Sequence, residues 1–412
     1  MRNWTWLQWS ILIGSISLVV LSGLAIYLLL QPSAAPPDIS EPVPELPIGE
    51  LPQPEIGRPP IPPSPVEQVP VSQLQGAITE RSPDLVALGS TTSVQTITPF
   101  PSDFVNLAAN GTDVNYYDPD TNRFFQIDQN GFIVDAGSQV FAEVENATWA
   151  PSGSSAVIEF PDGSNIVYDF ATNDQITLPA HWENFDFSPD SSKLAFKSMA
   201  VDIDQRWLAV SDLRGGSTRR IRALGRNGGM VNVNWAPNNQ VVATYDETRG
   251  LNRSELFFVG FNDENFPLSK LNGLKFEGNW TPSGDQMIYS IINETTNFNP
   301  QLWVVDGMGP TMGQNRKPIN LQTWTDKCSF VTDTEMICGV PQSLPQGAGL
   351  IRSVADDIAD DLYMVNIQNG STRLLASPQE DLQVKKLVIS EDGDRIFIQD
   401  NFTNQIKSIE LP

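Results

Sequence analysis

The amino-acid sequence predicts an all-β fold, a seven-bladed β-propeller, and three observations support this prediction. The first is a recurring phrase in which an aromatic residue, a small residue and a proline precede a polar turn. Its clear copies are Trp149–Gly153, Phe187–Ser191, Trp235–Asn239 and Trp280–Gly284. Looser copies lie at Leu107–Gly111, Phe330–Thr334 and Ile389–Gly393, which makes seven repeats. The second observation is their spacing of roughly 38 to 59 residues, a period typical of propellers and repeat arrays.

The third observation concerns the two ends of the repeat region. The last repeat has room for only three strands, at Lys386–Ser390, Arg395–Asp400 and Gln405–Leu411. A strand-like segment, Ser93–Pro99, precedes the first full repeat. If this segment supplies the missing fourth strand, the ring closes and two open sheet edges disappear.

Each repeat is predicted to form about four strands, the number in one propeller blade. The aromatic residue ends an inner strand and is expected to pack between neighbouring sheets. The proline stops that strand because it has no N–H to donate. An Asp, Ser, Asn or Gly turn then leads into an apolar strand such as Leu194–Phe196, and further strands follow, such as Trp207–Asp212.

The segment Ile11–Leu30 is apolar and carries no charge. Its twenty residues would span ~30 Å as a helix, the thickness of a bilayer core, so the sequence predicts one transmembrane helix. Arg2 precedes the segment, and acidic residues follow it until Arg58. The positive-inside rule therefore places the N-terminus in the cytoplasm and the C-terminal domain outside, in the periplasm or at the cell surface. The alternative is a cleaved signal peptide, which would release a soluble periplasmic protein.

Fourteen prolines lie between Pro32 and Pro70. They exclude a helix or a central strand and favour extended polyproline II structure. We interpret this stretch as a stalk, although Pro59–Pro62 also has the PxxP form of a docking ligand. The predicted organisation is a cytoplasmic tip and anchor at 1–31, a proline-rich stalk and connector at 32–92, and the propeller at 93–412.

Composition excludes several classes of function. The 412 residues carry a formal net charge of −24, and such a surface repels nucleic acid. A single histidine and two cysteines are too few for a Cys/His metal cage, so neither a metal nor a cofactor is expected. Cys328 and Cys338 flank the predicted hairpin around Asp333. A disulfide and two buried thiols both remain open at this point.

Four further features of the sequence could carry chemistry. His181 has no nucleophile motif beside it, so a structural or solvent-facing role is expected. Asp118–Asn122 begins like a calcium loop but lacks the required glycine, which favours a turn. The acidic stretch Asp356–Asp361 is expected to be a solvated loop, with a calcium ion as the alternative. Arginines concentrate at Arg214–Arg226 and suggest an outer strand facing solvent, or a patch for an anionic partner.

The phrases with Pro189-Asp190 and the turns Ser152-Gly153 and Ser283-Gly284 resemble the TolB-like, or PD40-type, WD40-like propeller repeats. The resemblance covers roughly residues 93–412. It implies an extracytoplasmic platform for protein interactions in envelope complexes, although related propellers carry catalytic domains. This chain departs from the family in two expected ways: without the α/β domain that precedes the TolB propeller, and with an anchor that is not cleaved.

No catalytic or metal-binding residue is assigned from the sequence, and the ligand-binding residues are left open. The leading expectation is therefore a non-enzymatic, monomeric, membrane-anchored propeller that binds an envelope protein or polymer as a scaffold. The alternative is a propeller-type envelope enzyme, a lyase, glycosidase or dehydrogenase, whose active-site residues are dispersed over inner strands. Carboxylates that converge beside a pocket at the central channel would favour the enzyme.

Overall fold

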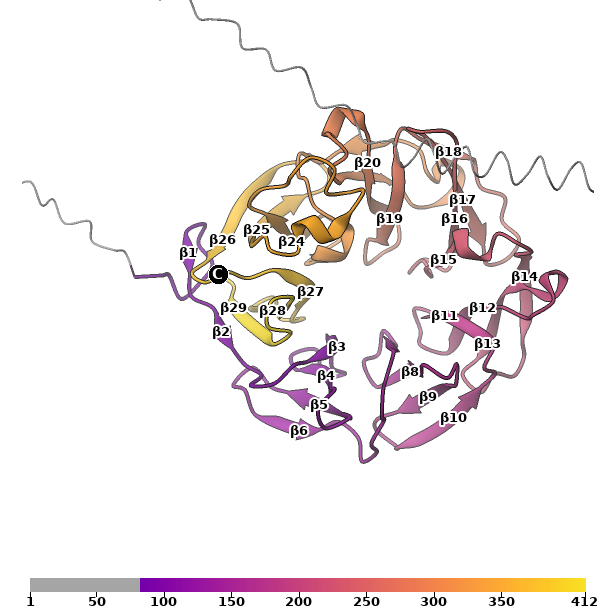
Figure 1. The fold of residues 1–412 in the computed structure, drawn as a ribbon, viewed down its shortest axis with the longest axis horizontal. Helices are drawn as coiled ribbons and strands as arrows, with labels where there is room; N and C mark the ends of the chain where they lie inside the picture. The colour runs from indigo at the N-terminus through magenta and orange to yellow at the C-terminus, as the bar shows by residue number, and fades with distance from the viewer. Residues whose placement is uncertain (1–81) are drawn as a thin grey trace, which may run out of the picture. The chain divides into compact units, whose positions relative to one another are not determined.

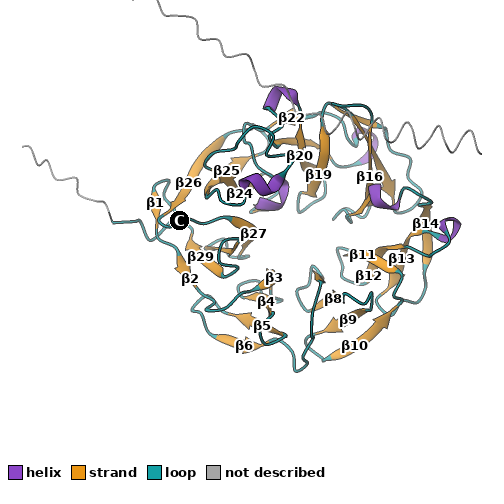
Figure 2. Ribbon diagram, viewed as in Figure 1, coloured by secondary structure: helices purple, strands orange, loops and turns teal. Residues whose placement is uncertain are grey.

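The computed structural model describes residues 82–412, which belong to one compact unit of the chain. Seven sheets, six of four strands and one of five, stand radially around a central axis (Figure 1). Apart from single turns of 3₁₀ helix, the ring consists of strands and loops (Figure 2). The predicted all-β, seven-bladed propeller is confirmed.

The first four sheets each use consecutive strands, with the first strand nearest the axis. They comprise β3 (Asp103–Leu107), β4 (Val114–Asp118), β5 (Arg123–Ile127) and β6 (Ile133–Asp135); β7 (Asn146–Trp149), β8 (Ser155–Glu159), β9 (Asn165–Asp169) and β10 (Asp174–Leu178); β11 (Trp182–Phe187), β12 (Lys193–Ser198), β13 (Trp207–Asp212) and β14 (Arg219–Ala223); and β15 (Val231–Val233), β16 (Val241–Thr248), β17 (Ser254–Gly260) and β18 (Ser269–Leu271).

The remaining three sheets complete the ring. The fifth contains β19 (Leu274–Trp280), β20 (Gln286–Ile292), β21 (Gln301–Asp306) and β22 (Lys317–Pro318). The sixth contains β23 (Cys328–Phe330), β24 (Glu335–Pro341), β25 (Asp360–Asn366) and β26 (Thr372–Pro378), and the seventh contains β27 (Val384–Ile389), β28 (Arg395–Asp400) and β29 (Ile406–Glu410). The short 3₁₀ helices are η2 (Ile203–Gln205), η3 (Gly228–Met230), η4 (Glu294–Thr296), η5 (Gly309–Thr311), η6 (Thr325–Lys327) and η7 (Arg352–Ala355).

Two short strands precede β3. The strand expected within Ser93–Pro99 is β2 (Gln95–Thr96), which pairs antiparallel with β29 as the outermost strand of the seventh sheet. The strand β1 (Thr91–Thr92) was not foreseen, and it adds a fifth, parallel strand to the sixth sheet beside β26. Residue Val86 also bridges to Glu410. The paired part of the chain therefore begins before Ser93, inside the segment interpreted as a connector.

The recurring phrase joins neighbouring blades. The indole Nε1 of Trp149 donates a hydrogen bond of 2.7 Å to the carbonyl of Phe104 in the preceding sheet. The indole Nε1 of Trp280 likewise donates a hydrogen bond of 3.3 Å to the carbonyl of Asn234 in the preceding blade. The turn glycine Gly153 has a φ of 67°, and a Cβ there would lie 2.7 Å from the carbonyl oxygen of Leu107. Glycine is thus required by the close approach of this turn to the preceding blade.

The hydrophobic core is divided into clusters that lie between adjacent sheets. One cluster brings Ile97, Val105 and Phe397 together, from the two ends of the described chain and the first blade. Another joins Val241 and Leu256 of the fourth sheet to Met287 and Tyr289 of the fifth. Each blade therefore buries apolar surface against its two neighbours, and this contact is what holds the inner strands in place around the axis.

The predicted transmembrane helix and the proline-rich stalk lie outside the described residues. Within residues 82–412, no helix is long and apolar enough to cross a membrane.

Cys328 and Cys338 form a disulfide across β23 and β24, where they stand directly opposite each other. Their Cα atoms are 4.1 Å apart, and both side chains are buried. Of the two possibilities that the sequence leaves open, the structure has the bonded one.

Reduction of this disulfide is expected to lower the free energy of unfolding by about 2–3 kcal/mol. The bond closes a loop with a sequence separation of 10, and its loss frees the unfolded chain. Urea unfolding with and without a thiol reductant measures the change. The double variant Cys328→Ala/Cys338→Ala is the control, because a reductant should not alter its midpoint; an equal response in both proteins would contradict the assignment.

Candidate active site

A pocket of about 430 Å³ opens on the inner face of the ring. The innermost strands β27, β3 and β7 supply most of its walls, and Figure 1 shows β27 and β3 side by side next to the axis. We call it the axial pocket; its lining residues are Asp103, Phe104, Val105, Asn106, Ala147, Thr148, Trp149, Lys385, Lys386 and Gln399. The first and second blades and the seventh, from opposite ends of the described chain, contribute to it, as a dispersed active site requires.

Lys386 also lies in the axial pocket. No other described residue forms a hydrogen bond or an ion pair with its ammonium group. A bulge in β27 between Val384 and Lys386 sets the side chains of Lys385 and Lys386 toward solvent. Although Lys386 is reached by water, protein surrounds it within the ring, and this desolvation lowers its pKa below the usual value. The negative charge of Asp326 opposes the shift only in part. A larger fraction of Lys386 is therefore neutral near pH 7 than for a surface lysine.

The neighbouring Lys385 is held by a polar network. Its Nζ lies 3.1 Å from Oδ1 of Asp103 and 3.0 Å from Oδ1 of Asn404. The amide of Gln399 donates to Asn404 at 2.9 Å and to the backbone of Ser102 at 2.7 Å. These contacts hold the Lys385 ammonium in an ion pair with Asp103 beside Lys386 and tie the seventh blade to the first.

A smaller cavity of about 210 Å³ shares Lys385 and continues toward the sixth blade. In it, Arg352 pairs with both carboxylate oxygens of Asp326, at 2.7 and 3.0 Å, and its guanidinium lies over the ring of Trp324. Burial and the nearby charge of Asp326 raise the pKa of Glu277 on β19. The inner face near blades five to seven thus combines fixed cations with carboxylates.

A third pocket, of about 300 Å³, lies on the second and third blades. Its glutamates are Glu145, Glu159 and Glu183. Burial raises the pKa of Glu159, and the charges of the other two add to this effect. The amide of Asn146 donates to Glu159 at 2.6 Å. Three glutamates therefore line this pocket on the second and third blades.

Asp186 on β11 joins the third blade to the fourth. Its carboxylate accepts hydrogen bonds from the backbone N–H of Trp235 at 2.6 Å and of Phe187 at 2.8 Å. Burial raises its pKa to about 6 in spite of these two bonds.

This raised pKa predicts that Asp186 stabilises the fold more at acidic pH. The stabilisation is complete below the unfolded-state pKa of about 4 and is lost as the pH rises through about 6. Between pH 7 and pH 4, the free energy of unfolding of the wild type should rise relative to that of Asp186→Asn by about 2 kcal/mol. Urea unfolding of both proteins across this range tests it, and a difference that does not change with pH would contradict the shift.

The residues that the sequence suggested as possible functional sites lie outside the axial pocket. His181 is exposed at the turn before β11, as expected. Asp118 closes a turn by accepting from Asp120 N and Thr121 Oγ1. The acidic stretch is not a solvated loop throughout, because Asp360 is buried and paired with Lys327 at 2.8 Å.

Part of the arginine cluster forms the outer strand β14, as the alternation of arginine with apolar residues predicted. The axial lysines were missed. Their signal in the sequence was two consecutive lysines at the start of a predicted inner strand, the strand of each blade that faces the axis.

No protein-family model matches the chain, and no curated protein does. Solved structures do match. An oligogalacturonate lyase in complex with manganese has a TM-score of 0.54 at 12% identity, over 77% of this chain and 93% of that chain. An oligogalacturonate lyase from Vibrio parahaemolyticus has 0.51 at 12%, over 77% and 93%. A β-propeller domain from Myceliophteria thermophila has 0.51 at 12%, over 77% and 100%. At these identities the likeness shows the shared fold.

The comparisons correct one expectation. The sequence led us to expect that this propeller is not an enzyme, and the comparisons overturn the ground for that expectation, because two of the solved structures with this fold are lyases and the fold is therefore compatible with catalysis. The error came from reading an absence of sequence motifs as an absence of chemistry. An active site assembled from several inner strands leaves no local motif.

The described residues do not fit the manganese of the first of these structures. In the part of the chain that the structure covers, no three His, Cys, Asp or Glu side chains are placed to hold a metal ion. The single histidine, His181, lines none of the pockets described above. These residues therefore do not form a site for a catalytic metal ion.

Proposed function

We propose that this chain is a propeller-type lyase that cleaves an acidic, uronate-containing sugar chain in the axial pocket, with Lys386 as the general base. The observation that carries the proposal is the position of Lys386, which is open to solvent, surrounded by protein and engaged by no other described side chain. Its neighbour Lys385 provides a fixed positive charge for the carboxylate of the sugar. The shared fold with two lyases supports the same class of reaction.

The reaction would be a β-elimination. The neutral amine of Lys386 takes the proton from the carbon next to the sugar carboxylate, and the electron pair forms a carbon–carbon double bond. The bond from the adjacent carbon to the glycosidic oxygen breaks, and that oxygen takes a proton from water. Lys385 lowers the cost of the negative charge that builds up on the carboxylate during proton removal.

A screen with uronate polymers tests the proposal. The full-length purified protein is incubated with polymers of galacturonate, glucuronate or mannuronate, and the ultraviolet absorbance of the conjugated double bond is followed. The proposal predicts that at least one polymer yields this absorbance at a rate proportional to protein concentration. If none of the polymers is cleaved, the lyase assignment is wrong.

A second candidate is a glycosidase centred on Glu159. The raised pKa of this carboxyl suits a general acid, and Glu145 and Glu183 are carboxylates in the same pocket. Hydrolysis adds water to the product and creates no double bond. Cleavage without ultraviolet absorbance that is lost in Glu159→Gln, and kept in Lys386→Met, would favour this candidate over the lyase.

For the chain as a whole, we infer membership of the TolB-like, PD40-type propeller group and a place in the cell envelope. The recurring phrases support the first inference, and the apolar segment Ile11–Leu30 supports the second. Under this proposal Ile11–Leu30 anchors the protein with its N-terminus in the cytoplasm, and the stalk carries the enzyme toward an envelope polymer. Membrane fractionation, and protease treatment of intact cells, would show whether the propeller is anchored and extracytoplasmic.

A further inference from the structure

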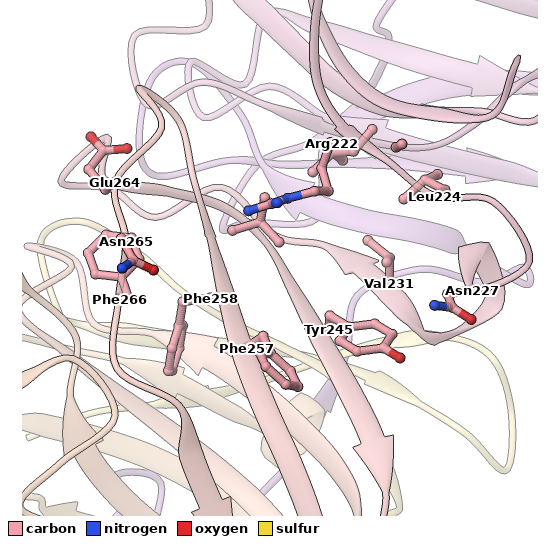
Figure 3. Close-up of a pocket in the computed structure, with 13 residues that line it drawn as sticks. Arg222, Leu224, Asn227, Val231, Tyr245, Phe257, Phe258, Glu264, Asn265 and Phe266 are labelled. Carbon is pink, nitrogen blue, oxygen red and sulfur yellow. The ribbon is translucent and has the colours of Figure 1, made fainter. Parts of the chain in front are cut away.

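A cavity of about 300 Å³ lies between the third and fourth blades, away from the axial pocket. Figure 3 shows the aromatic rings of Tyr245 and Phe257 on one side and Leu224 and Val231 on another. The rings of Tyr245 and Phe257 lie with their centroids 5.4 Å apart. The walls combine these apolar side chains with the polar side chains of Arg222, Asn227 and Asn265, and the volume is at the lower end for small-molecule sites, large enough for one apolar side chain.

Arg222 extends over this cavity from β14 (Figure 3). Among residues 82–412, no carboxylate pairs with its guanidinium. The only carboxylate in the wall, that of Glu264, accepts two hydrogen bonds within its own loop, from the backbone N–H of Asn262 at 2.6 Å and from its amide at 3.2 Å. Arg222 thus presents a positive charge, with no carboxylate partner among the described residues, at the mouth of a partly apolar cavity.

Two more arginines on β14 are held in place. Arg219 donates to the carbonyl of Phe261 at 2.7 Å and lies 4.4 Å above that ring. Arg220 lies 5.0 Å above the ring of Trp207. Because these contacts fix the guanidinium groups without using a carboxylate, a ligand that pairs with them loses less conformational freedom on binding.

The strand β14 is also an outer strand. It pairs with β13 on one side, and no described strand pairs with its other side. Such an edge offers backbone donors and acceptors to an extended peptide, while arginines repel a second basic edge. In a chain of net charge −24, this is a local reversal of sign that favours an acidic partner.

We propose that β14 and the adjoining cavity bind an acidic peptide segment of a partner protein. The peptide pairs with the free edge of β14, places one aromatic or branched apolar side chain in the cavity, and sets its carboxylates against Arg222 and its neighbours. This site is separate from the axial pocket, and it does not depend on the proposed lyase activity. It gives the protein a surface for recruitment that leaves the ring axis open.

An array of acidic hexapeptides tests the proposal, with the third position varied through all amino acids and the others held as Asp or Glu. The probe is the fluorescently labelled full-length protein. We expect retention by peptides with an aromatic or branched apolar third residue, and at least tenfold weaker retention when alanine stands there. Affinity should also fall as salt is added, because the arginines are exposed.

Two variants separate specific from general electrostatic binding. Arg222→Gln removes the charge over the cavity, and Arg214→Gln removes an equal, exposed charge from the turn between β13 and β14. Arg222→Gln is expected to weaken the best peptide at least tenfold, and Arg214→Gln less than twofold, with both variants melting as the wild type does.

Three results would overturn the proposal. One is that no peptide is retained above the Arg222→Gln background, and another is that both variants weaken binding equally. The third is that trimers of galacturonate displace the best peptide, which would make β14 a sugar site.

Discussion

Replacing Lys386 with methionine is expected to reduce the rate of uronate cleavage by roughly 10²–10⁴-fold, the usual contribution of a general base. Methionine fills a similar volume but cannot accept a proton. Because Lys386 is open to solvent at a bulge of β27, the fold should be unaffected. The measurement is kcat on the best polymer from the screen, together with a thermal melt to show that the ring is intact.

Lys386→Arg separates the role of a base from that of a charge. Arginine keeps the positive charge, but its pKa is too high for it to lose a proton, so its rate should fall as far as that of methionine. In the wild type, the rate should rise with pH and level off below the pH at which an ordinary lysine titrates, because the pKa of Lys386 is lowered. Lys270→Met, on the outer strand β18, is the matched control and should retain full activity. An active Lys386→Arg would contradict the assignment of Lys386 as the base.

Replacing Lys327 with methionine is expected to lower the free energy of unfolding by about 3–5 kcal/mol. Its Nζ lies 2.8 and 3.0 Å from the two carboxylate oxygens of Asp360, and both side chains are almost completely buried. The same carboxylate accepts the backbone N–H of Val384 at 2.7 Å, which links the sixth blade to β27. Removing the ammonium leaves a buried carboxylate without its partner.

The exposed pair Arg123–Asp135, with an N–O distance of 3.5 Å, provides the control. Arg123→Met should cost under about 1 kcal/mol, because solvent screens an exposed pair. Urea unfolding of both variants gives the comparison. Equal losses in the two would show that the Lys327–Asp360 pair is no more important to the ring than a surface contact.

The repeated phrase carried most of the fold prediction, for a physical reason. Its proline, turn and aromatic residue act locally, so residues such as Trp149 and Gly153 could be assigned to a strand end and a turn from sequence alone. The same holds for Cys328 and Cys338, whose distances from the hairpin centre place them opposite each other. Local turn chemistry repeated seven times is enough to define the number of blades.

The site could not be predicted in the same way, because it depends on which side chains face the axis. A bulge in β27 leaves both Lys385 and Lys386 exposed in the axial pocket, and bulges leave no clear sequence signal. Asp360 was expected to be solvated because it follows other aspartates. It is instead buried and paired with Lys327, which lies 33 residues away in the sequence. The strand β1 is only two residues long and pairs with a distant strand, so its own sequence carries no periodic pattern.

The proposed lyase is tested most sharply by the masses of the products released from a uronate oligomer of defined length. The wild type should release fragments whose masses sum to that of the oligomer, with one fragment unsaturated, and Lys386→Met should release none. Fragments whose masses sum to the oligomer plus one water would identify hydrolysis and contradict the assignment of a lyase. Equal release by Lys386→Met would contradict the axial pocket as its site.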